Sequence, residues 1–218
     1  MDLLDAYALI ALMALSSASV VWYFKMRRKM IKFLRDFTVE LEEVIRPRDK
    51  EYLLLGYLVG YKATYTLTDG SNVYVLLTTA PIHSLLYYPI AKALKRENIV
   101  EMALRLNNRA VIRDIHAVKD DQKRYKYLLE KDLGDEINRL NRSRIYTKWG
   151  IYEIYYEDPR DVNYIQYILN NDKNLPIYKI SAYKKLNMVE IATRAEVGTV
   201  EYLYESLREF AKKITKST

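Results

Sequence analysis

The sequence predicts an α+β protein, in which an N-terminal transmembrane helix precedes antiparallel sheet hairpins with helices packed on one side. An apolar run without proline or glycine extends from Leu3 to Phe24 and contains one charge, Asp5. After it, segments with apolar residues at every second position alternate with segments in which apolar residues recur every three or four positions. These two periods are typical of half-buried strands and amphipathic helices.

The apolar run has the length and the flanking charges of a membrane anchor. About 20 apolar residues in a helix cover the roughly 30 Å of a bilayer's hydrocarbon core. A signal peptide carries its cations before the apolar run, and a buried core helix is usually shorter and amphipathic, so these two alternatives fit less well. Four cations follow the run here: Lys25, Arg27, Arg28 and Lys29.

The position of these cations predicts the topology of the chain. Cytoplasmic flanks of membrane spans are rich in Lys and Arg, and Trp and Tyr favour the headgroup level, where Trp22 and Tyr23 lie. We therefore expect a single-pass protein of the cell membrane with its N-terminus outside and its C-terminal domain in the cytoplasm. The expected division is an anchor at 1–24, a basic amphipathic juxtamembrane helix at 25–50 and a cytosolic α+β domain at 51–218.

The first predicted hairpin follows Pro47, which ends the juxtamembrane helix near Arg46. Apolar and polar residues alternate over 57–68, turn residues occupy 69–72, and a second strand covers 73–79. The sequence "GYLVG" in the first strand has the spacing of a membrane dimer motif, but its apolar surroundings are too short to span. A helix is expected at 84–96, after Pro81.

The second unit is expected to repeat this order. Strands at 99–106 and 110–118 flank a turn at Asn107 and Asn108. Asp120 can then cap a helix. One apolar stripe runs along that helix: Tyr125, Leu128, Leu129, Leu133, Ile137 and Leu140.

The last two units complete the pattern. A strand at 149–156 precedes Asp158 and Pro159, an N-cap and a first helical residue, and a helix bearing Val162, Ile165 and Leu169 follows. Strands at 177–183 and 186–194 are separated by a break at 184–185. The final helix has an apolar stripe: Val200, Leu203, Tyr204, Leu207, Phe210, Ala211 and Ile214.

The charge balance favours anionic partners. The chain has 35 Lys and Arg against 28 Asp and Glu, and it contains no cysteine. Lipid headgroups and nucleic acids fit this balance, although a solvated basic domain with no such partner is an alternative. The missing cysteine excludes disulfides, cysteine nucleophiles and cysteine-containing zinc sites.

Signatures of catalysis are missing from the sequence. The six glycines fit neither a P-loop nor a dinucleotide-binding loop, and no serine lies in a G-x-S-x-G elbow. Of the two histidines, His116 has Asp114 two residues away, so a small His/carboxylate site is conceivable, while an ordinary hydrogen-bonded histidine is the simpler interpretation. We expect no enzyme, no cofactor and no metal.

Two groups of cations are candidate polyanion-binding sites. The segment "NRLNRSR" is expected at the end of a helix, where cations can also serve the helix-end carbonyls. The second group closes the chain on a helix that can instead be a solvated, fraying end. The first group is Arg139, Arg142, Arg144 and Lys148, and the second is Arg208, Lys212, Lys213 and Lys216.

The order of elements resembles the calumin-like family, single-pass proteins of the endoplasmic reticulum that belong to the PAT chaperone complex at the translocon. A span with cations on its inner side leads into an amphipathic helix, and two stretches carry the rest. These are "LLYYPIAKALKRENIVEMALRLNNRAVIRDIHAVKDDQKRYKYLLEKDL" and "VNYIQYILNNDKNLPIYKISAYKKLNMVEIATRAEVGTVEYLYESLREFAKKI". The resemblance covers residues 3 to about 214 and would make this chain a short relative, of archaeal type.

The resemblance implies a cytosolic domain at the membrane that contacts the protein-conducting channel, the ribosome with its RNA, and a small membrane-protein partner. Calumin-like proteins carry an acidic segment before the span and a long basic coiled coil at their end. Only Met1 and Asp2 precede the apolar run here, and the sequence stops at Thr218. A ribosome contact would therefore use one of the two basic groups.

Three classes of function remain after this comparison. A non-enzymatic adaptor for ribosome and translocon, which assists membrane-protein insertion or folding, is the leading expectation. A membrane-tethered interaction module that binds anionic lipid or another protein is the alternative. An unrecognised membrane-bound enzyme is the third.

Overall fold

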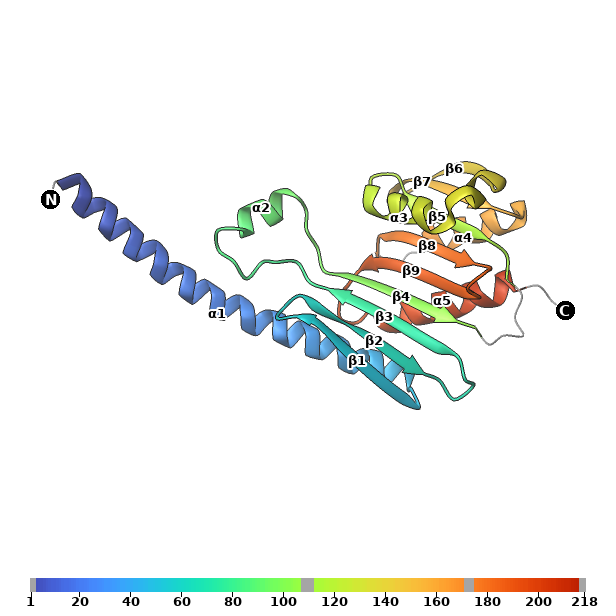
Figure 1. Ribbon diagram of the computed structural model, residues 1–218, viewed down its shortest axis with the longest axis horizontal. Coiled ribbons are helices and arrows are strands. Elements are labelled where there is room, and N and C mark those ends of the chain that lie inside the picture. Colours follow the sequence, from blue (N-terminus) through green and yellow to red (C-terminus); the bar gives the residue numbers. More distant parts are fainter. Residues whose placement is uncertain (1–2, 107–111, 171–174, 216–218) are drawn as a thin grey trace.

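A single long helix connects the N-terminus to the globular part of the chain (Figure 1). The computed structural model describes residues 3–106, 112–170 and 175–215. Helix α1 (Leu3–Ile45) has 43 residues and no break at the expected boundary between anchor and juxtamembrane helix. It ends where Arg46 takes a φ of 47° and Pro47 follows, a residue that disfavours helix before it.

The two halves of α1 have different surroundings. By length and composition α1 can cross a membrane, and none of its apolar window is buried. The second half carries one buried stripe, Met30, Phe37, Leu41 and Ile45, because these positions meet one face of the sheet and helix α5. The juxtamembrane part of α1 is thus also part of the domain core.

Nine antiparallel strands form one sheet in the described part of the chain, in the order β1-β2-β3-β4-β9-β8-β5-β7-β6. The strands are β1 (Asp49–Gly56), β2 (Gly60–Thr66), β3 (Asn72–Thr78), β4 (Ile99–Arg105), β5 (Ile115–Lys119), β6 (Asn141–Thr147), β7 (Gly150–Tyr156), β8 (Ile177–Tyr183) and β9 (Met188–Arg194). The helices after α1 are α2 (Tyr88–Ala93), α3 (Lys123–Leu133), α4 (Pro159–Asn170) and α5 (Val200–Ile214), with a 3₁₀ helix η1 (Gly134–Arg139).

Helices α1, α4 and α5 share one face of the sheet, which confirms the predicted α+β architecture. Their buried side chains, such as Phe37, Ile165 and Phe210, belong to the main hydrophobic core. Helix α3 differs, since Tyr125 and Leu129 pack in a second cluster with side chains on the other face. In Figure 1, α3 accordingly lies in front of the sheet and α5 behind it.

The C-terminal units form as predicted. Helix α4 begins at Pro159, and the Asp158 carboxylate accepts a hydrogen bond from the Arg160 backbone N–H at 3.0 Å. Strands β8 and β9 make the expected hairpin. The predicted stripe of α5 is buried from Val200 to Ile214. Local pattern suffices here because neighbours in the chain are also neighbours in space.

The predicted strand at 57–68 is wrong in its first part. Residues 57–59 form a turn, and strand β1 before it was missed. Gly60 has a φ of 132°, and a Cβ there would lie 1.9 Å from the Leu77 carbonyl oxygen, so only glycine fits. The glycines of "GYLVG" therefore close a hairpin. β1 escaped prediction because all eight of its residues are exposed and no alternation marks them.

The predicted hairpin between 99–106 and 110–118 is also wrong. Strand β4 pairs with β3 and β9, whereas β5 pairs with β7 and β8. The turn expected at Asn107 and Asn108 lies outside the described residues. Two strands that follow each other in sequence thus lie three places apart in the sheet, a separation that local periodicity does not encode.

Two helix predictions need shorter bounds. The helix expected from Asp120 to Leu140 ends at Leu133, since Gly134 takes a φ of 52° and begins η1. Its N-cap is Gln122 instead of Asp120. The helix expected at 84–96 is regular only over α2. The shorter α3 leaves residues 141–147 free to form β6 at the sheet edge.

Candidate functional site

The membrane-flanking cations lie on the exposed part of α1, next to its contact with the loop before α2. Lys25, Arg28 and Lys29 are exposed, and the Arg27 guanidinium lies 5.4 Å from the centre of the Tyr57 ring. One turn earlier, the Trp22 Nε1–H donates to the Ile82 carbonyl at 3.1 Å. The predicted cluster thus sits at the point where the globular part of the chain begins to surround α1.

The first predicted basic group lies at a helix end only in its first residue. Arg139 ends η1, Arg142 and Arg144 lie on β6, and Lys148 is in the β6–β7 turn. Side chains two residues apart on a strand share a face. Arg142 and Arg144 therefore point to the same side of the sheet, the side that α3 covers.

A buried carboxylate organises these two arginines. Arg142 and Arg144 donate to Glu153 Oε1 at 2.6 and 2.9 Å, and Lys126 Nζ of α3 lies 2.8 Å from Oε2. The Glu153 side chain is 2% exposed, while those of Arg142 and Arg144 are 52% and 59% exposed. We call Lys126, Arg142 and Arg144 the β6 cluster.

The electrostatics of the β6 cluster keep Glu153 charged. Burial alone raises the pKa of Glu153, but the hydrogen bonds from Lys126, Arg144 and Arg142 outweigh it and bring the pKa to about 2. Three cations then surround one anion, so the group is a net cation at its surface. Guanidinium groups keep further N–H donors, and such planar forks bind phosphate oxygens in pairs.

The second basic group lies on the exposed side of α5. Arg208, Lys212 and Lys213 are exposed, and the Arg208 guanidinium lies 5.6 Å from the centre of the Tyr204 ring. Lys216 lies outside the described residues. Helix α5 covers the face of the sheet opposite to α3, so the fold does not bring this group together with the β6 cluster.

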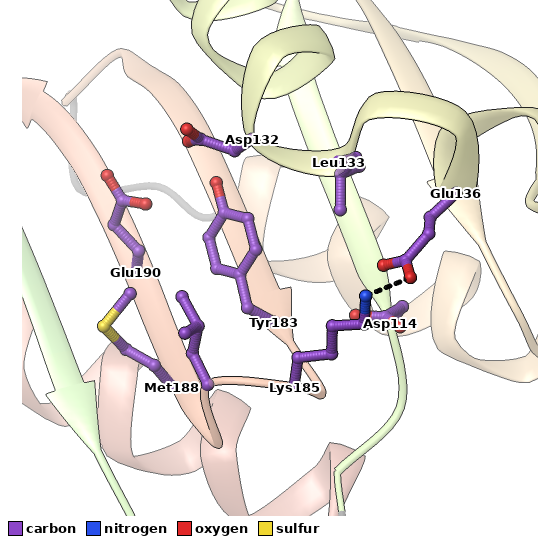
Figure 2. A pocket seen from close by; sticks show the side chains of 9 residues that line it. Asp114, Asp132, Leu133, Glu136, Tyr183, Lys185, Met188 and Glu190 are labelled. Atoms are coloured by element: carbon purple, nitrogen blue, oxygen red, sulfur yellow. Dashed lines mark ion pairs between the residues drawn. The ribbon is translucent and has the colours of Figure 1, made fainter.

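A cavity of about 290 Å³ opens beside α3, and its mainly apolar walls also carry four acidic side chains. Figure 2 shows the Tyr183 ring rising between Asp132 and Glu190, and an ion pair between Lys185 and Glu136 at the rim. Asp114 completes the acidic lining. Sequence reasoning missed this cavity because its lining comes from distant parts of the chain, which strand pairing and the packing of α3 on the sheet bring together.

His116 lies under this cavity and is fully buried. Its ring centre is 4.9 Å from that of Tyr183, and its Nε2 is 3.9 Å from Asp114 Oδ1, too far for a hydrogen bond. Burial, together with the nearby Lys179 charge, lowers the pKa of His116 to about 3, so the ring is neutral. The conceivable His/carboxylate pair is thus near but not hydrogen-bonded.

The described residues offer little for catalysis or for metal binding. Among them, no group of three or more His, Cys, Asp or Glu side chains has the geometry to hold a metal ion. Ser181 is opposite His116 in the sheet, but both side chains are fully buried and neither makes a hydrogen bond. A nucleophile and its base need such a bond and access to substrate.

The described residues thus present cations on two separate surfaces and beside the apolar part of α1, and acidic side chains in the cavity beside α3. No protein-family model matches the chain, and no curated protein is similar to it in sequence.

Proposed function

We propose that this chain is a non-enzymatic adaptor anchored in the cell membrane by the first half of α1. The apolar residues of α1 are exposed, and the run that they form is long enough to span a bilayer. The cations after them favour an N-terminus outside and a globular domain in the cytoplasm, because positively charged flanks stay on the cytoplasmic side.

The observation that carries this proposal is the continuity of α1 from the span into the domain core. The same helix carries the exposed apolar run and the buried Phe37 and Leu41, so it holds the domain in one orientation to the bilayer. β6 lies toward the opposite end of the long axis from the N-terminus (Figure 1). The β6 cluster therefore faces the cytosol, where its polyanion would be RNA and not lipid.

Ribosomal RNA is the polyanion that such a position favours. A domain confined to the membrane surface meets ribosomes that dock there at a raised effective concentration, which compensates for weak contacts. The resemblance to calumin-like proteins points the same way. We infer that the partners are the ribosome, the protein-conducting channel and a small membrane protein, during the insertion or folding of new membrane proteins.

Binding to anionic lipid is the second candidate function. It is favoured by the exposed Lys25, Arg28 and Lys29, which follow the apolar run within two turns of α1. Cations in such a position are attracted to the anionic lipids of the cytoplasmic leaflet. This function needs no contact at the β6 cluster, so the two candidates can be separated by experiment.

Co-sedimentation of ribosomes with the full chain in nanodiscs tests the adaptor. Each phosphate contact adds a slope of roughly −0.7 to −0.9 to log K against log salt, so three cations predict about −2 to −3. The double variant Arg142→Gln/Arg144→Gln should weaken binding and make the slope shallower by roughly 1.5.

The matched control is Arg142→Lys/Arg144→Lys, which keeps the charge and should retain most of the binding. Thermal unfolding of each variant checks that the domain stays folded. Binding to ribosomes that is the same in the glutamine variant and the wild type would refute the RNA contact at the β6 cluster. Binding of the wild type to anionic vesicles but not to ribosomes would favour the lipid module.

The orientation has its own test. A reporter fused after Thr218 should be active only in the cytoplasm, and replacing Lys25, Arg27, Arg28 and Lys29 by glutamine should weaken that orientation. Protection of the domain from protease in sealed inside-out vesicles would contradict the proposed topology.

A further inference from the structure

The segment Leu86–Arg96, which contains α2, turns its apolar side outward. Leu86, Ile90 and Leu94 recur every four residues and are 70%, 50% and 57% exposed, whereas Ala91 is buried. Backbone hydrogen bonds from Tyr88 to Ser84 and from Leu94 to Ile90 extend the helical turns to both ends of the segment. A surface helix normally buries its apolar stripe. This stripe is not buried by the domain, so whatever packs against it lies outside the domain.

Two aromatic contacts fix the position of α2 along α1. The Trp22 ring centre lies 4.9 Å from that of Tyr88, and the Tyr23 ring centre lies 6.2 Å from that of His83. Trp22 also donates to the carbonyl of Ile82. In Figure 1, α2 lies beside the middle of α1 and reaches closer to the N-terminus than the strands. The segment is therefore level with the last turn of the apolar run, where a bilayer would meet water.

The charges of the segment match an anionic lipid surface. Lys92, Lys95 and Arg96 are exposed, and residues 86–96 contain no acidic side chain. A short helix with an exposed apolar stripe and cations beside it is typical of elements that lie in the plane of the membrane interface. At the neighbouring level of α1, the tip of the β1–β2 turn adds Tyr57, which is 58% exposed.

We propose that Leu86–Arg96 lies in the cytoplasmic leaflet beside the span, with its apolar stripe at the acyl boundary and its cations on anionic headgroups. This rests on the proposed membrane insertion of α1. We choose lipid as the partner of the stripe because the stripe lies at the same level along α1 as the end of its exposed apolar run. Together, the span and this segment give the domain two contacts with the bilayer, which restrain the tilt of α1 and hold the β6 cluster toward the cytosol.

The chain has no cysteine, so single-cysteine variants of the full chain can each carry one spin label. The variants Leu86→Cys and Ile90→Cys report on the segment, and Leu12→Cys reports on the span. Tyr146→Cys reports on the far end of the domain, because Tyr146 lies on β6 and its side chain is 73% exposed. All are reconstituted in nanodiscs of phosphatidylcholine and phosphatidylglycerol. Relaxation by oxygen, which partitions into lipid, is compared with relaxation by a water-soluble nickel complex.

We expect labels at Leu86 and Ile90 to give an oxygen-to-nickel ratio several-fold above that at Tyr146. A lipid-like ratio at Leu12 with a water-like ratio at Ile90 would overturn the inference and leave the proposed anchor intact. A water-like ratio at Leu12 would instead overturn the anchor itself, and the inference with it. Labels at Leu86 and Ile90 that are shielded from both reagents would mean that protein covers the stripe, which also overturns it.

A second variant tests the contribution of the cations. Replacing Lys92, Lys95 and Arg96 by glutamine in the Ile90→Cys chain should lower the oxygen-to-nickel ratio in the anionic nanodiscs, because attraction to the headgroups is lost. An unchanged ratio would overturn the assignment of these cations to headgroups.

Discussion

The two ends of the molecule are opposite exceptions to the rule that apolar side chains are buried and charged side chains are exposed. At the end that contains α2 and the β1–β2 turn, apolar side chains are exposed, as in Leu54 and Leu86 at 78% and 70%. At the end that contains β5 to β8, charged side chains are buried, as in Lys179 and Glu153 at 3% and 2%. Lone exposed apolar residues are common, whereas buried charges are rare unless they are paired.

The two ends differ in what offsets the free-energy cost of these unusual side-chain positions. Lys179 pairs with Glu190 at 2.7 Å, and Glu153 binds three cations, so the buried charges are satisfied inside the fold. The exposed leucines belong to neither hydrophobic cluster. For Leu86, the proposed contact of its segment with lipid would remove this apolar surface from water.

The largest expected effect tests the packing of the globular end. Leu207→Ala should destabilise the full chain by roughly 2–5 kcal/mol, because Leu207 is fully buried and its removal leaves a cavity. Leu54→Ala removes the same atoms from an exposed site and should change stability by less than about 0.5 kcal/mol. Denaturant unfolding in detergent, followed by circular dichroism, measures both.

Glu205→Ala, on the exposed side of α5, is the control on the same helix and should be nearly silent. Equal losses at Leu207 and Leu54 would end the comparison, since both leucines would then be part of one packed core.

The next effect concerns the buried charge under the β6 cluster. Glu153→Gln should cost about 1.5–3 kcal/mol, because hydrogen bonds between charged groups are lost and a weaker acceptor stays buried. Asp121→Asn removes an ion pair to Lys119 at a 62% exposed side chain and should cost less than about 1 kcal/mol. Similar costs at both sites in unfolding experiments would mean that burial does not strengthen the Glu153 contacts.

Acid should remove the stabilisation of the fold that the Glu153 carboxylate provides. The pKa of Glu153 is about 2 in the folded protein against 4.5 for an ordinary glutamate. A depressed pKa stabilises the fold above the unfolded value, and this contribution is lost as pH falls from about 4.5 toward 2. The stability difference between wild type and Glu153→Gln should therefore shrink over this range. A constant difference would show that Glu153 titrates normally.

The smallest effect sharpens the view of α1 as both anchor and core helix. The Glu40 carboxylate accepts hydrogen bonds from the backbone N–H groups of Gly198 and Val200 at 2.6 and 2.9 Å, at the start of α5. Glu40→Gln should cost about 0.5–1 kcal/mol, because a negative charge at a helix N-terminus is favourable. Glu43→Gln, on the exposed side of α1, should be silent. Equal effects at both positions would exclude a capping contribution from Glu40.

Local pattern predicted those parts of the fold in which sequence neighbours are also spatial neighbours. The β8–β9 hairpin, α4 and α5 are of this kind, because their turns and caps lie within a few residues. β1 and β6 were missed: β1 has no alternation of burial, and β6 follows a helix stripe that appeared to continue. The order of the strands in the sheet could not be predicted from local pattern, since pairings such as that of β4 with β9 join residues about 90 positions apart.

The candidate site divides in the same way. The sequence by itself determined the apolar run with its cations, the α+β alternation and the identities of Arg142 and Arg144, because each follows from local composition and period. Only the tertiary structure decided that these arginines share one buried carboxylate with Lys126, since strand pairing and the packing of α3 bring the four residues together. The stripe of Leu86, Ile90 and Leu94 is visible in the sequence, but packing of Tyr88 on Trp22 decides that it faces outward.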